Sequence, residues 1–424
     1  MDVIEKILLV KPKERTSVLL SFFFFFSLLC AYFVLRPIRD EMGIQNGAEN
    51  MQWLFTGTFL AMLFIVPVFG LLNRRYSPFS LLLYCYTFFF LNILGFYGLF
   101  HLEIGLGWLP TAFFIWISVF NLFVVSLFWS FMADLFSSFS SKRVFGVIAS
   151  GGSLGAISGP LLSNYLSYLV SFKEMLLVAA LLLSIGIGCM LGLFSMAKNS
   201  LPEENRMSKQ KRSNQNSGLF YGISNTFKSN YLLGIATFVL LYTSISTFLY
   251  FEQAHLLEVA SLNSGQRISY FSKVDLATNT LAIVGQLLFT SRIIKKMGLA
   301  LTMAIIPLLV AIGLFLMGFK LSLILIAVLL IVHRAGNFFL LRPSKEILFT
   351  VTSHEYKYQS KNFIDTAIYR GGDAITGWFF AGLTSLGLGL STIALVAVPL
   401  ALLWSYNGLR LGLGHAKREL NTSI

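Results

Sequence analysis

Charged residues are scarce in this sequence. Only 12% of its 424 residues are Asp, Glu, Lys or Arg, whereas 56% are hydrophobic. Because a soluble domain carries roughly a quarter charged residues, this composition excludes a soluble protein and indicates an integral membrane protein. A chain of this length has room for about a dozen membrane spans of ~20 residues each.

Residue patterns that support metal binding or nucleophilic chemistry are also missing. The three cysteines, Cys30, Cys85 and Cys189, lie within apolar runs, without a C-x-x-C or Cys/His spacing. This placement favours small apolar filler residues over a metal site or a disulfide framework. The five histidines are scattered, and no nucleophile–base pattern occurs. We therefore expect no cofactor, no metal and no enzymatic activity.

Long hydrophobic runs predict twelve transmembrane helices and an all-α integral membrane fold. The runs are continuous and contain Gly and Pro, whereas the strands of a membrane barrel would alternate at every second residue. The predicted spans cover approximately residues 16–38, 51–72, 78–100, 108–133, 145–170, 175–197, 231–251, 274–294, 298–319, 321–343, 362–385 and 389–409.

Basic residues are concentrated in alternate connections. With the N-terminus inside, 24 of the 32 Lys and Arg residues fall in inner connections and six in outer ones, while Arg334 and Arg370 lie within spans. The positive-inside rule then places both termini in the cytoplasm, and we expect a multi-pass protein of the bacterial inner membrane. The net charge of +13 is thereby explained without a nucleic-acid partner.

The longest polar connection divides the chain into two halves. We predict an N-terminal six-helix bundle (1–197), a cytoplasmic central loop (198–230) and a C-terminal six-helix bundle (231–424). The end of the loop is either a short amphipathic helix on the inner surface or the beginning of span seven. Asp134 and Glu346 hold matching places in the two halves. A 6+6 arrangement around a central cavity is typical of major-facilitator transporters, and we expect a monomer.

Span five contains the sequence GGSLGAISG, in which Gly151, Gly155 and Gly159 are each four residues apart. No phosphate-binding pattern of the G-x-x-x-x-G-K-[ST] type is present, and the run lies in an apolar helix. The spacing therefore predicts a close approach between this helix and a neighbour through small residues.

Charges interrupt the apolar pattern between His333 and Trp378. Because a charge is costly inside a bilayer, charges at membrane depth usually face a cavity or a partner. We interpret this stretch as part of a polar path through the membrane. Its charged residues are Arg334, Arg342, Lys345, Glu346, Glu355, Lys357, Lys361, Asp365, Arg370 and Asp373.

Arg334 and Arg370 are the main candidates for substrate binding. Arg334 lies about 20 Å into span ten, and Arg370 lies about 12 Å into span eleven from the other face, so both are expected to face one cavity. Asp373, three residues after Arg370, is placed to pair with it, which leaves a structural ion pair as the alternative. Arg334 has no acidic residue within a turn or two in its span. Since guanidinium donors meet two phosphate oxygens at once, we expect a small anionic substrate.

Span one ends in the sequence FVLRPIRDEMG, which places Arg36 and Arg39 at the outer end of the span. They are either interfacial anchoring charges or two further ligands for an anion.

A second group of charges is predicted near the inner face. These residues are either ordinary charges at helix ends or an inner gate whose ion pairs break when the cavity opens. The candidates for gating or coupling are Asp134, Lys345, Glu346, Lys361, Asp365 and, in the membrane, Asp373. An outer gate could include Glu252, Glu258 and Asp275.

Three motifs resemble the nucleotide exchangers of plastids and obligate intracellular bacteria. The segment R-P-S-K-E followed by K-x-x-x-K-N-F-I-D resembles their D-P-x-K-E-M, K-x-x-x-K and I-D pattern. The end of span one, L-R-P-I-R-D, resembles their L-R-D-x-K-D, and F-W-S-F-x-A-D with K-R-x-F resembles their F-W-x-F-A-N-E with A-K-R-F. The matching residues are Pro343, Lys345, Glu346, Lys357, Lys361, Ile364, Asp365, Arg36, Asp40, Lys142, Arg143 and Phe145.

The resemblance implies a secondary transporter that exchanges nucleotides such as ATP and ADP by alternating access. It also implies that Arg39 and Asp134 fall where charges matter for transport. The sequence departs from the family at Arg370-Gly371-Gly372-Asp373, where the family has G-K-S-G-G. One alternative is a transporter of another organic anion or a drug, driven by protons through Asp134 or Asp373. A second alternative is a transport-inactive membrane scaffold that docks a partner through the central loop.

Overall fold

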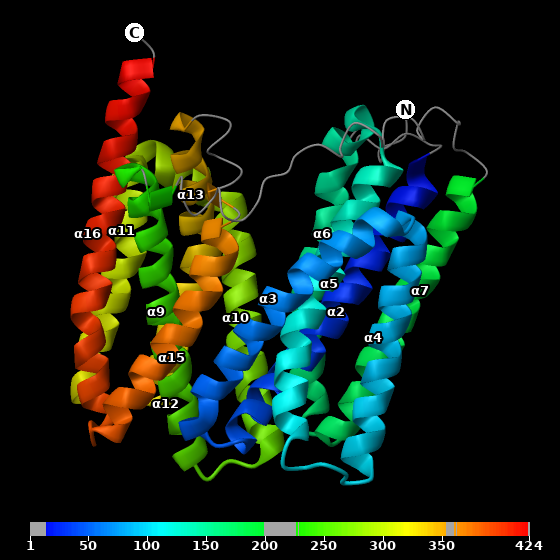
Figure 1. Ribbon diagram of the computed structural model, residues 1–424, viewed down its shortest axis with the longest axis horizontal. Helices are drawn as coiled ribbons and strands as arrows, with labels where there is room; N and C mark the ends of the chain where they lie inside the picture. Colours follow the sequence, from blue (N-terminus) through cyan, green and yellow to red (C-terminus); the bar gives the residue numbers. More distant parts are fainter. Residues whose placement is uncertain (1–13, 199–225, 228, 353–359, 362, 423–424) are drawn as a thin grey trace. The chain divides into compact units, whose positions relative to one another are not determined.

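The computed structural model describes residues 14–198, 226–227, 229–352, 360–361 and 363–422. Within these ranges all regular structure is helical and no strand occurs (Figure 1). Most of the predicted central loop (198–230) lies outside the described ranges, including nearly all of the stretch for which an amphipathic helix is one alternative. The matching residue Lys357 also lies outside them.

The first half of the chain contains six long helices, which agree in order with the first six predicted spans. They are α2 (Arg15–Gln45), α3 (Met51–Arg75), α4 (Pro78–His101), α5 (Leu109–Leu135), α6 (Ser138–Leu166) and α7 (Phe172–Lys198). A short 3₁₀-helix, η2 (Ala48–Asn50), precedes α3.

The second half follows the same plan with two interruptions. Four of its helices are α9 (Asn230–Val259), α10 (Ser264–Leu288), α11 (Thr290–Phe319), which is kinked at Gly298, and α16 (Leu390–Thr422). Span ten consists of α12 (Leu323–Gly336), the π-helix η5 (Asn337–Leu341), α13 (Arg342–Leu348) and the 3₁₀-helix η6 (Phe349–Val351). The described part of span eleven is mainly the π-helix η7 (Ile364–Ile368) and α15 (Tyr369–Ser385).

Ten helices in the described ranges are long and apolar enough to cross a membrane. The remaining two, α10 and α15, hold the eighth and eleventh places in the chain. The predicted fold class is therefore confirmed: the chain is an all-α, multi-pass membrane protein, and each of the twelve predicted spans contains a helix in the described ranges. The predicted bounds of span eight were wrong, because its polar first ten residues do not score as apolar. The helix α10 runs from Ser264 to Leu288, and residues 290–294 belong to the first part of α11, which ends in a kink at Gly298, where φ is 74°.

The chain divides into two compact units. Unit 1 contains residues 1–46, 60–214 and 262–276, and unit 2 contains residues 47–59, 215–261 and 277–424. Each unit therefore takes one short segment from the other half of the sequence. The beginning of α3 belongs to unit 2, and the beginning of α10 belongs to unit 1.

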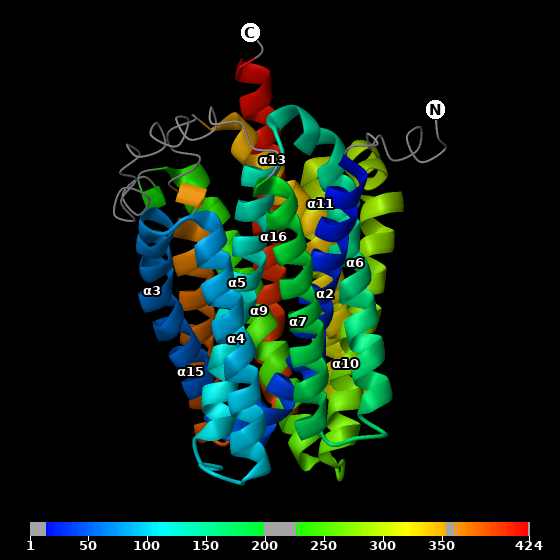
Figure 2. The same ribbon diagram turned by 90° about the vertical axis from the view of Figure 1, so that its right-hand side faces the viewer.

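In unit 1, α2 packs most closely against α6 and α7 (Figure 2). The glycine stripe of α6 makes this possible. A Cβ atom at Gly151 would lie 2.4 Å from the carbonyl oxygen of Phe22, and one at Gly155 would lie 2.5 Å from that of Phe26. The predicted close approach through small residues is confirmed, and its partner is the backbone of α2. Beside it, the rings of Phe25 and Phe128 stack with centroids 4.2 Å apart.

In unit 2, α11 and α16 run side by side (Figure 1). Again a glycine permits the contact, since a Cβ atom at Gly412 would lie 2.2 Å from the Cα atom of Ala300. The helix α9 packs against both α15 and α16. These contacts bring the polar residues of α9, α12 and α15 together inside unit 2.

Candidate functional site

The arginines at the end of α2 are engaged with carboxylates. Arg36 Nη1 lies 3.4 Å from Asp275 Oδ1 on α10, and Arg39 donates from Nε to Asp40 Oδ1 at 2.9 Å. All four residues belong to unit 1. The choice between anchoring charges and substrate ligands stays open for Arg36 and Arg39, and their role in binding an anion stays a prediction.

The first residues of α10 (264–276) form what we call the polar clamp, the set of their contacts with α2 and α6 in unit 1. Two ion pairs connect it to α2. One is the Arg36–Asp275 pair, and in the other Arg267 Nη1 lies 3.8 Å from Glu41 Oε1. The carboxylates of Glu41 and Asp275 are almost completely buried, at 1% and 2% side-chain exposure. The polar clamp therefore holds charges away from solvent by pairing them.

Hydrogen bonds connect the polar clamp to α6. Ser269 Oγ donates to Asn164 Oδ1 at 2.7 Å, and Ser272 Oγ lies 2.9 Å from Ser163 Oγ. The hydroxyl of Tyr168 lies 2.8 Å from Ser269 Oγ. Sequence analysis did not identify these residues, because small hydroxyl side chains are common in membrane helices and their partners lie about a hundred residues away.

Residues 47–59 form what we call the aromatic clamp, the set of their contacts with α9 and α15 in unit 2. The indole rings of Trp53 and Trp378 meet edge to face, with centroids 4.7 Å apart. Trp378 Nε1 also donates to Thr56 Oγ1 at 3.0 Å. The backbone amide of Ala48 lies 3.3 Å from both carboxylate oxygens of Glu258.

Of the acidic residues expected at an outer gate, Asp275 lies in the polar clamp and Glu258 in the aromatic clamp. Glu252 lies elsewhere on α9 and is fully buried. Among the described residues, neither of its carboxylate oxygens has a hydrogen-bond partner.

A second polar cluster lies inside unit 2, where α15 meets α9. Arg370 Nη1 lies 3.6 Å from Asp373 Oδ2, as their i, i+3 spacing predicted. Asp373 also accepts a hydrogen bond from Thr247 Oγ1 of α9 at 3.2 Å. The Arg370 guanidinium lies 5.5 Å from the ring centroid of Tyr369. The distance within this ion pair is longer than a hydrogen bond.

Aromatic residues lie around the neighbouring part of span ten. The ring of His333 is fully buried and stacks on Tyr242, with centroids 4.8 Å apart and planes 5° from parallel. The Tyr242 hydroxyl accepts a hydrogen bond from Asn337 Nδ2 at 3.0 Å. Arg334, half-buried, lies between His333 and Asn337 in the sequence. This part of span ten therefore faces Tyr242 of α9, and Arg334 lies beside that contact.

The charges predicted near the inner face form two ion pairs within unit 2, between Lys345 and Asp365 and between Lys361 and Glu346. Both pairs connect α13 to the beginning of span eleven. The residues that resemble the nucleotide exchangers are thus brought together in space, although up to 20 positions separate them in the chain. Asp134, the remaining candidate, is exposed in the last turn of α5 in unit 1.

Sequence analysis missed two π-helices at these ion pairs: η5 directly precedes α13, and η7 contains Asp365. In η5, the carbonyl oxygen of Phe338 accepts a hydrogen bond from Gln286 Nε2 at 3.0 Å, and that of Phe339 accepts one from Thr290 Oγ1 at 2.5 Å. Polar side chains from α10 and α11 therefore stabilise the widened turn. Such turns are frequently found at functional sites.

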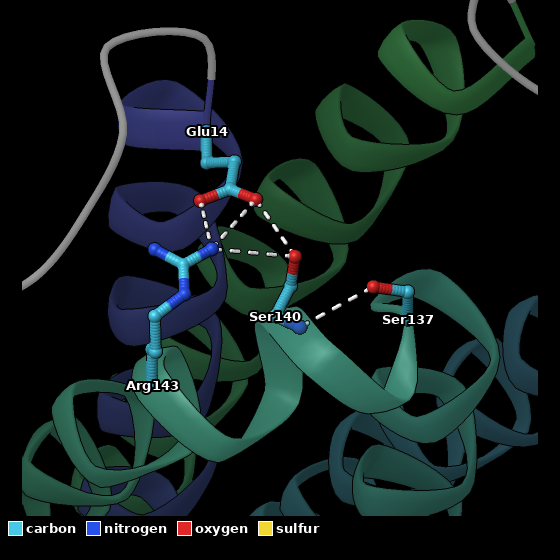
Figure 3. A network of polar contacts seen from close by, with 4 residues as sticks. All are labelled: Glu14, Ser137, Ser140 and Arg143. Carbon is cyan, nitrogen blue, oxygen red and sulfur yellow. Dashed lines mark hydrogen bonds and ion pairs between the residues drawn. The ribbon is translucent and has the colours of Figure 1, made fainter.

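A third network connects the first residues of α2 and α6. The Glu14 carboxylate accepts hydrogen bonds from Arg143 Nη2 at 3.1 and 3.2 Å and from Ser140 Oγ at 2.8 Å, and the Ser137 side chain accepts one from the Ser140 amide (Figure 3). Arg143 is one of the residues that match the nucleotide exchangers. In this structure it fastens two helices of unit 1 together.

Metal-ligand groups are not found in the part of the chain that the structure describes: no three His, Cys, Asp or Glu residues gather there around a possible ion. The cysteines Cys30, Cys85 and Cys189 are free, the first buried and the others half-buried.

Solved structures with this arrangement of helices are numerous. The nucleoside transporter NupG is 12% identical, with 93% of this chain and 98% of that chain covered and a TM-score of 0.67. A POT family transporter in complex with 5-aminolevulinic acid is 14% identical, with 94% and 96% covered and a TM-score of 0.65. The xylose transporter XylE from E. coli, in an inward open conformation, is 10% identical, with 92% and 95% covered and a TM-score of 0.60. Likeness at this level of identity shows the fold alone.

No curated protein matches the chain. The model of the Major Facilitator Superfamily, however, matches residues 16–354. This match includes α2 to α13 and therefore most of the chain, in agreement with the twelve helices and with the solved structures of the same fold. The protein belongs to the Major Facilitator Superfamily.

Proposed function

We propose that the protein is a secondary-active transporter that exchanges nucleotides of the ATP/ADP type. It works as a monomer in the bacterial inner membrane, with both termini in the cytoplasm. Alternating access is provided by the bundles 1–197 and 231–424. The protein acts on no covalent bond of its cargo and is not an enzyme.

The observation that carries this proposal is that the neighbours of Arg334 and Arg370 meet at one ring: His333 stacks on Tyr242, and the ring centroid of Tyr369 lies 5.9 Å from that of Tyr242. Both arginines belong to predicted spans, where a charge is retained only for a partner or a ligand. Arg370 Nη1 lies 3.6 Å from Asp373 Oδ2. Asp373 therefore orients the guanidinium while N–H donors remain for a ligand. A phosphate group offers both arginines the paired oxygens that a guanidinium binds best.

The residues shared with the nucleotide exchangers support the same cargo. Lys345, Glu346, Lys361 and Asp365 form two ion pairs, and we assign them to an inner gate together with Asp134. The polar and aromatic clamps form the corresponding outer gate. When the polar clamp opens, Arg36 loses its contact with Asp275, and Arg36 and Arg39 become available to the arriving anion.

Uptake by proteoliposomes tests this function. Labelled ATP should enter vesicles loaded with ADP and should not enter empty vesicles. Arg334→Ala and Arg370→Ala should each lower uptake about tenfold or more, because a charge-assisted hydrogen bond contributes roughly 1.5–3 kcal/mol. Arg410→Ala is the matched control, since Arg410 is an exposed arginine on α16. Normal uptake by both arginine variants at normal expression would remove this binding site.

A second candidate function is the proton-coupled transport of another organic anion. Two buried carboxyl groups favour it, since Glu252 and Asp373 are exposed by 0% and 8%. An inward proton gradient should then drive accumulation in vesicles that contain no counter-substrate, and Glu252→Gln should abolish this dependence. If the rate of uptake did not depend on the proton gradient, proton coupling would be rejected in favour of nucleotide exchange.

A further inference from the structure

We propose that Arg342 is a second phosphate-binding residue, and that the π-helix of span ten brings it into line with Arg334. Together with Arg370, these two arginines are suited to a diphosphate or triphosphate chain and discriminate against a single phosphate. This inference rests on the proposed function and extends it to the recognition of the cargo.

The register of span ten carries the argument. Successive residues of an α-helix are about 100° apart, so eight residues of regular helix would leave Arg342 about 80° from the face of Arg334. The π-helix η5 (Asn337–Leu341) lies between them and adds one residue to a turn. With that residue accommodated, the two arginines lie within about 20° of one face and about 10 Å apart along the axis.

The widened turn is held from outside the helix. Gln286 and Thr290 donate hydrogen bonds to the carbonyl oxygens of Phe338 and Phe339. The Phe339 ring in turn occupies the space beside Gly285, where a Cβ atom would lie 2.5 Å from it. Because side chains of both α10 and α11 stabilise the π-helical turn, they also fix the position of Arg342 in unit 2.

The surroundings of Arg342 suit an anion. Its side chain is exposed, and its guanidinium lies 4.8 Å from the ring centroid of Phe338. Stacking on a ring leaves the N–H donors at the guanidinium edge available for a ligand. Tyr369, whose ring centroid lies 5.5 Å from the Arg370 guanidinium, is influenced electrostatically by both Arg342 and Arg370.

Three guanidinium groups placed along a helix face and its neighbour match an elongated anion with several charged groups. A single phosphate occupies Arg334 and Arg370 and gains little from an arginine two turns away. A chain of two or three phosphates reaches all three. The inference therefore predicts that the protein binds a chain of phosphates more tightly than a single phosphate, and that this preference depends on Arg342.

The test measures the binding of pyrophosphate and of orthophosphate to the purified full-length protein in an uncharged detergent without added lipid. The wild type should bind pyrophosphate about tenfold more tightly than orthophosphate, the factor expected for one charge-assisted contact. Arg342→Gln should reduce that preference to about threefold or less and leave orthophosphate binding unchanged. Arg410→Gln, the matched control, should keep the full preference.

Removal of Phe338 tests the register itself, because it takes out the additional residue and leaves seven residues of regular helix between the two arginines, again within about 20° of one face. The preference should therefore be retained in this variant. Should the deletion fail to fold, Arg342→Lys tests the guanidinium directly, since a lysine keeps the charge but loses the guanidinium fork; the preference should then fall to an intermediate value.

An unchanged preference in Arg342→Gln, or no preference in the wild type, would overturn the inference. The two proposals fail separately. Absence of ATP/ADP exchange in vesicles, with the pyrophosphate preference retained and dependent on Arg342, would reject nucleotide exchange and keep this site.

Discussion

The polar clamp of unit 1 and the aromatic clamp of unit 2 are built from different chemistry. In the polar clamp, the pairs Arg36–Asp275 and Arg267–Glu41 are supported by hydroxyl groups. In the aromatic clamp, the main contact is made by the rings of Trp53 and Trp378. Each clamp joins a segment from one half of the sequence to the unit formed mainly by the other half.

The difference in chemistry determines how much free energy is needed to separate the contacts of each clamp. Breaking a buried ion pair leaves charges that must be solvated, which costs several kcal/mol unless water or a ligand takes the partner's place. Separating two exposed aromatic edges costs much less. An arriving anion can replace Asp275 beside Arg36, whereas it offers nothing to the tryptophans. In the proposed cycle, cargo therefore acts on the polar clamp.

The largest effect is expected from removing one charge of the polar clamp. Asp275→Asn deprives Arg36, whose side chain is only 18% exposed, of this partner. The free energy of unfolding should fall by about 3–5 kcal/mol, as for other buried pairs that lose one member, which thermal unfolding in detergent measures. The double variant Arg36→Met/Asp275→Leu should recover most of the loss. If the double variant lost a similar free energy of unfolding, packing and not charge would stabilise the polar clamp.

An intermediate effect is expected in the aromatic clamp. Trp378→Ala should lower the free energy of unfolding by about 1–2 kcal/mol, because it removes an edge-to-face contact and the hydrogen bond to Thr56. Trp378→Phe should retain part of that stability. A double-mutant cycle with Trp53→Ala should give a coupling free energy of about 0.5–1.5 kcal/mol. Additive effects of the two substitutions on the free energy of unfolding would contradict the ring contact.

The smallest effect is expected at the exposed edge of the polar clamp. Lys273 Nζ donates to the Tyr168 hydroxyl at 3.2 Å. Hydrogen bonding to Ser269 and then to Lys273 holds the pKa of the Tyr168 phenol below its usual value. Because both contacts favour the phenolate, Lys273→Met should raise that pKa with little change in stability. Ultraviolet titration, with Tyr168→Phe as the reference, measures the shift, and an unaltered titration curve would exclude the contact.

Much of the fold follows from local patterns in the sequence. Hydropathy finds a helix whenever about twenty apolar residues occur together, and ten of the spans satisfy this condition in the described ranges. The beginning of α10 was missed because the same polar residues that build the clamp disqualify it as an apolar run. The Arg370–Asp373 pair was predictable, since its members are one turn apart on one helix.

The remaining features of the site depend on contacts that no local pattern reports. The Tyr242–His333 stack joins α9 to α12, and the partners are 91 positions apart in the sequence. The π-helices leave no signature in composition, because one additional residue in a turn changes neither hydropathy nor charge. The donors from Gln286 and Thr290 that stabilise η5 belong to two other helices.

The contact between α2 and α6 has a consequence for how these two helices can vary. At Gly151 and Gly155, the atoms that a new side chain would meet are mainly the carbonyl oxygens of Phe22 and Phe26. Every amino acid carries such an oxygen, so α2 can exchange side chains beside this contact while still presenting the same surface. On α6 any side chain larger than hydrogen collides with that surface. Related sequences should therefore tolerate substitutions on one side of this joint and almost none on the other.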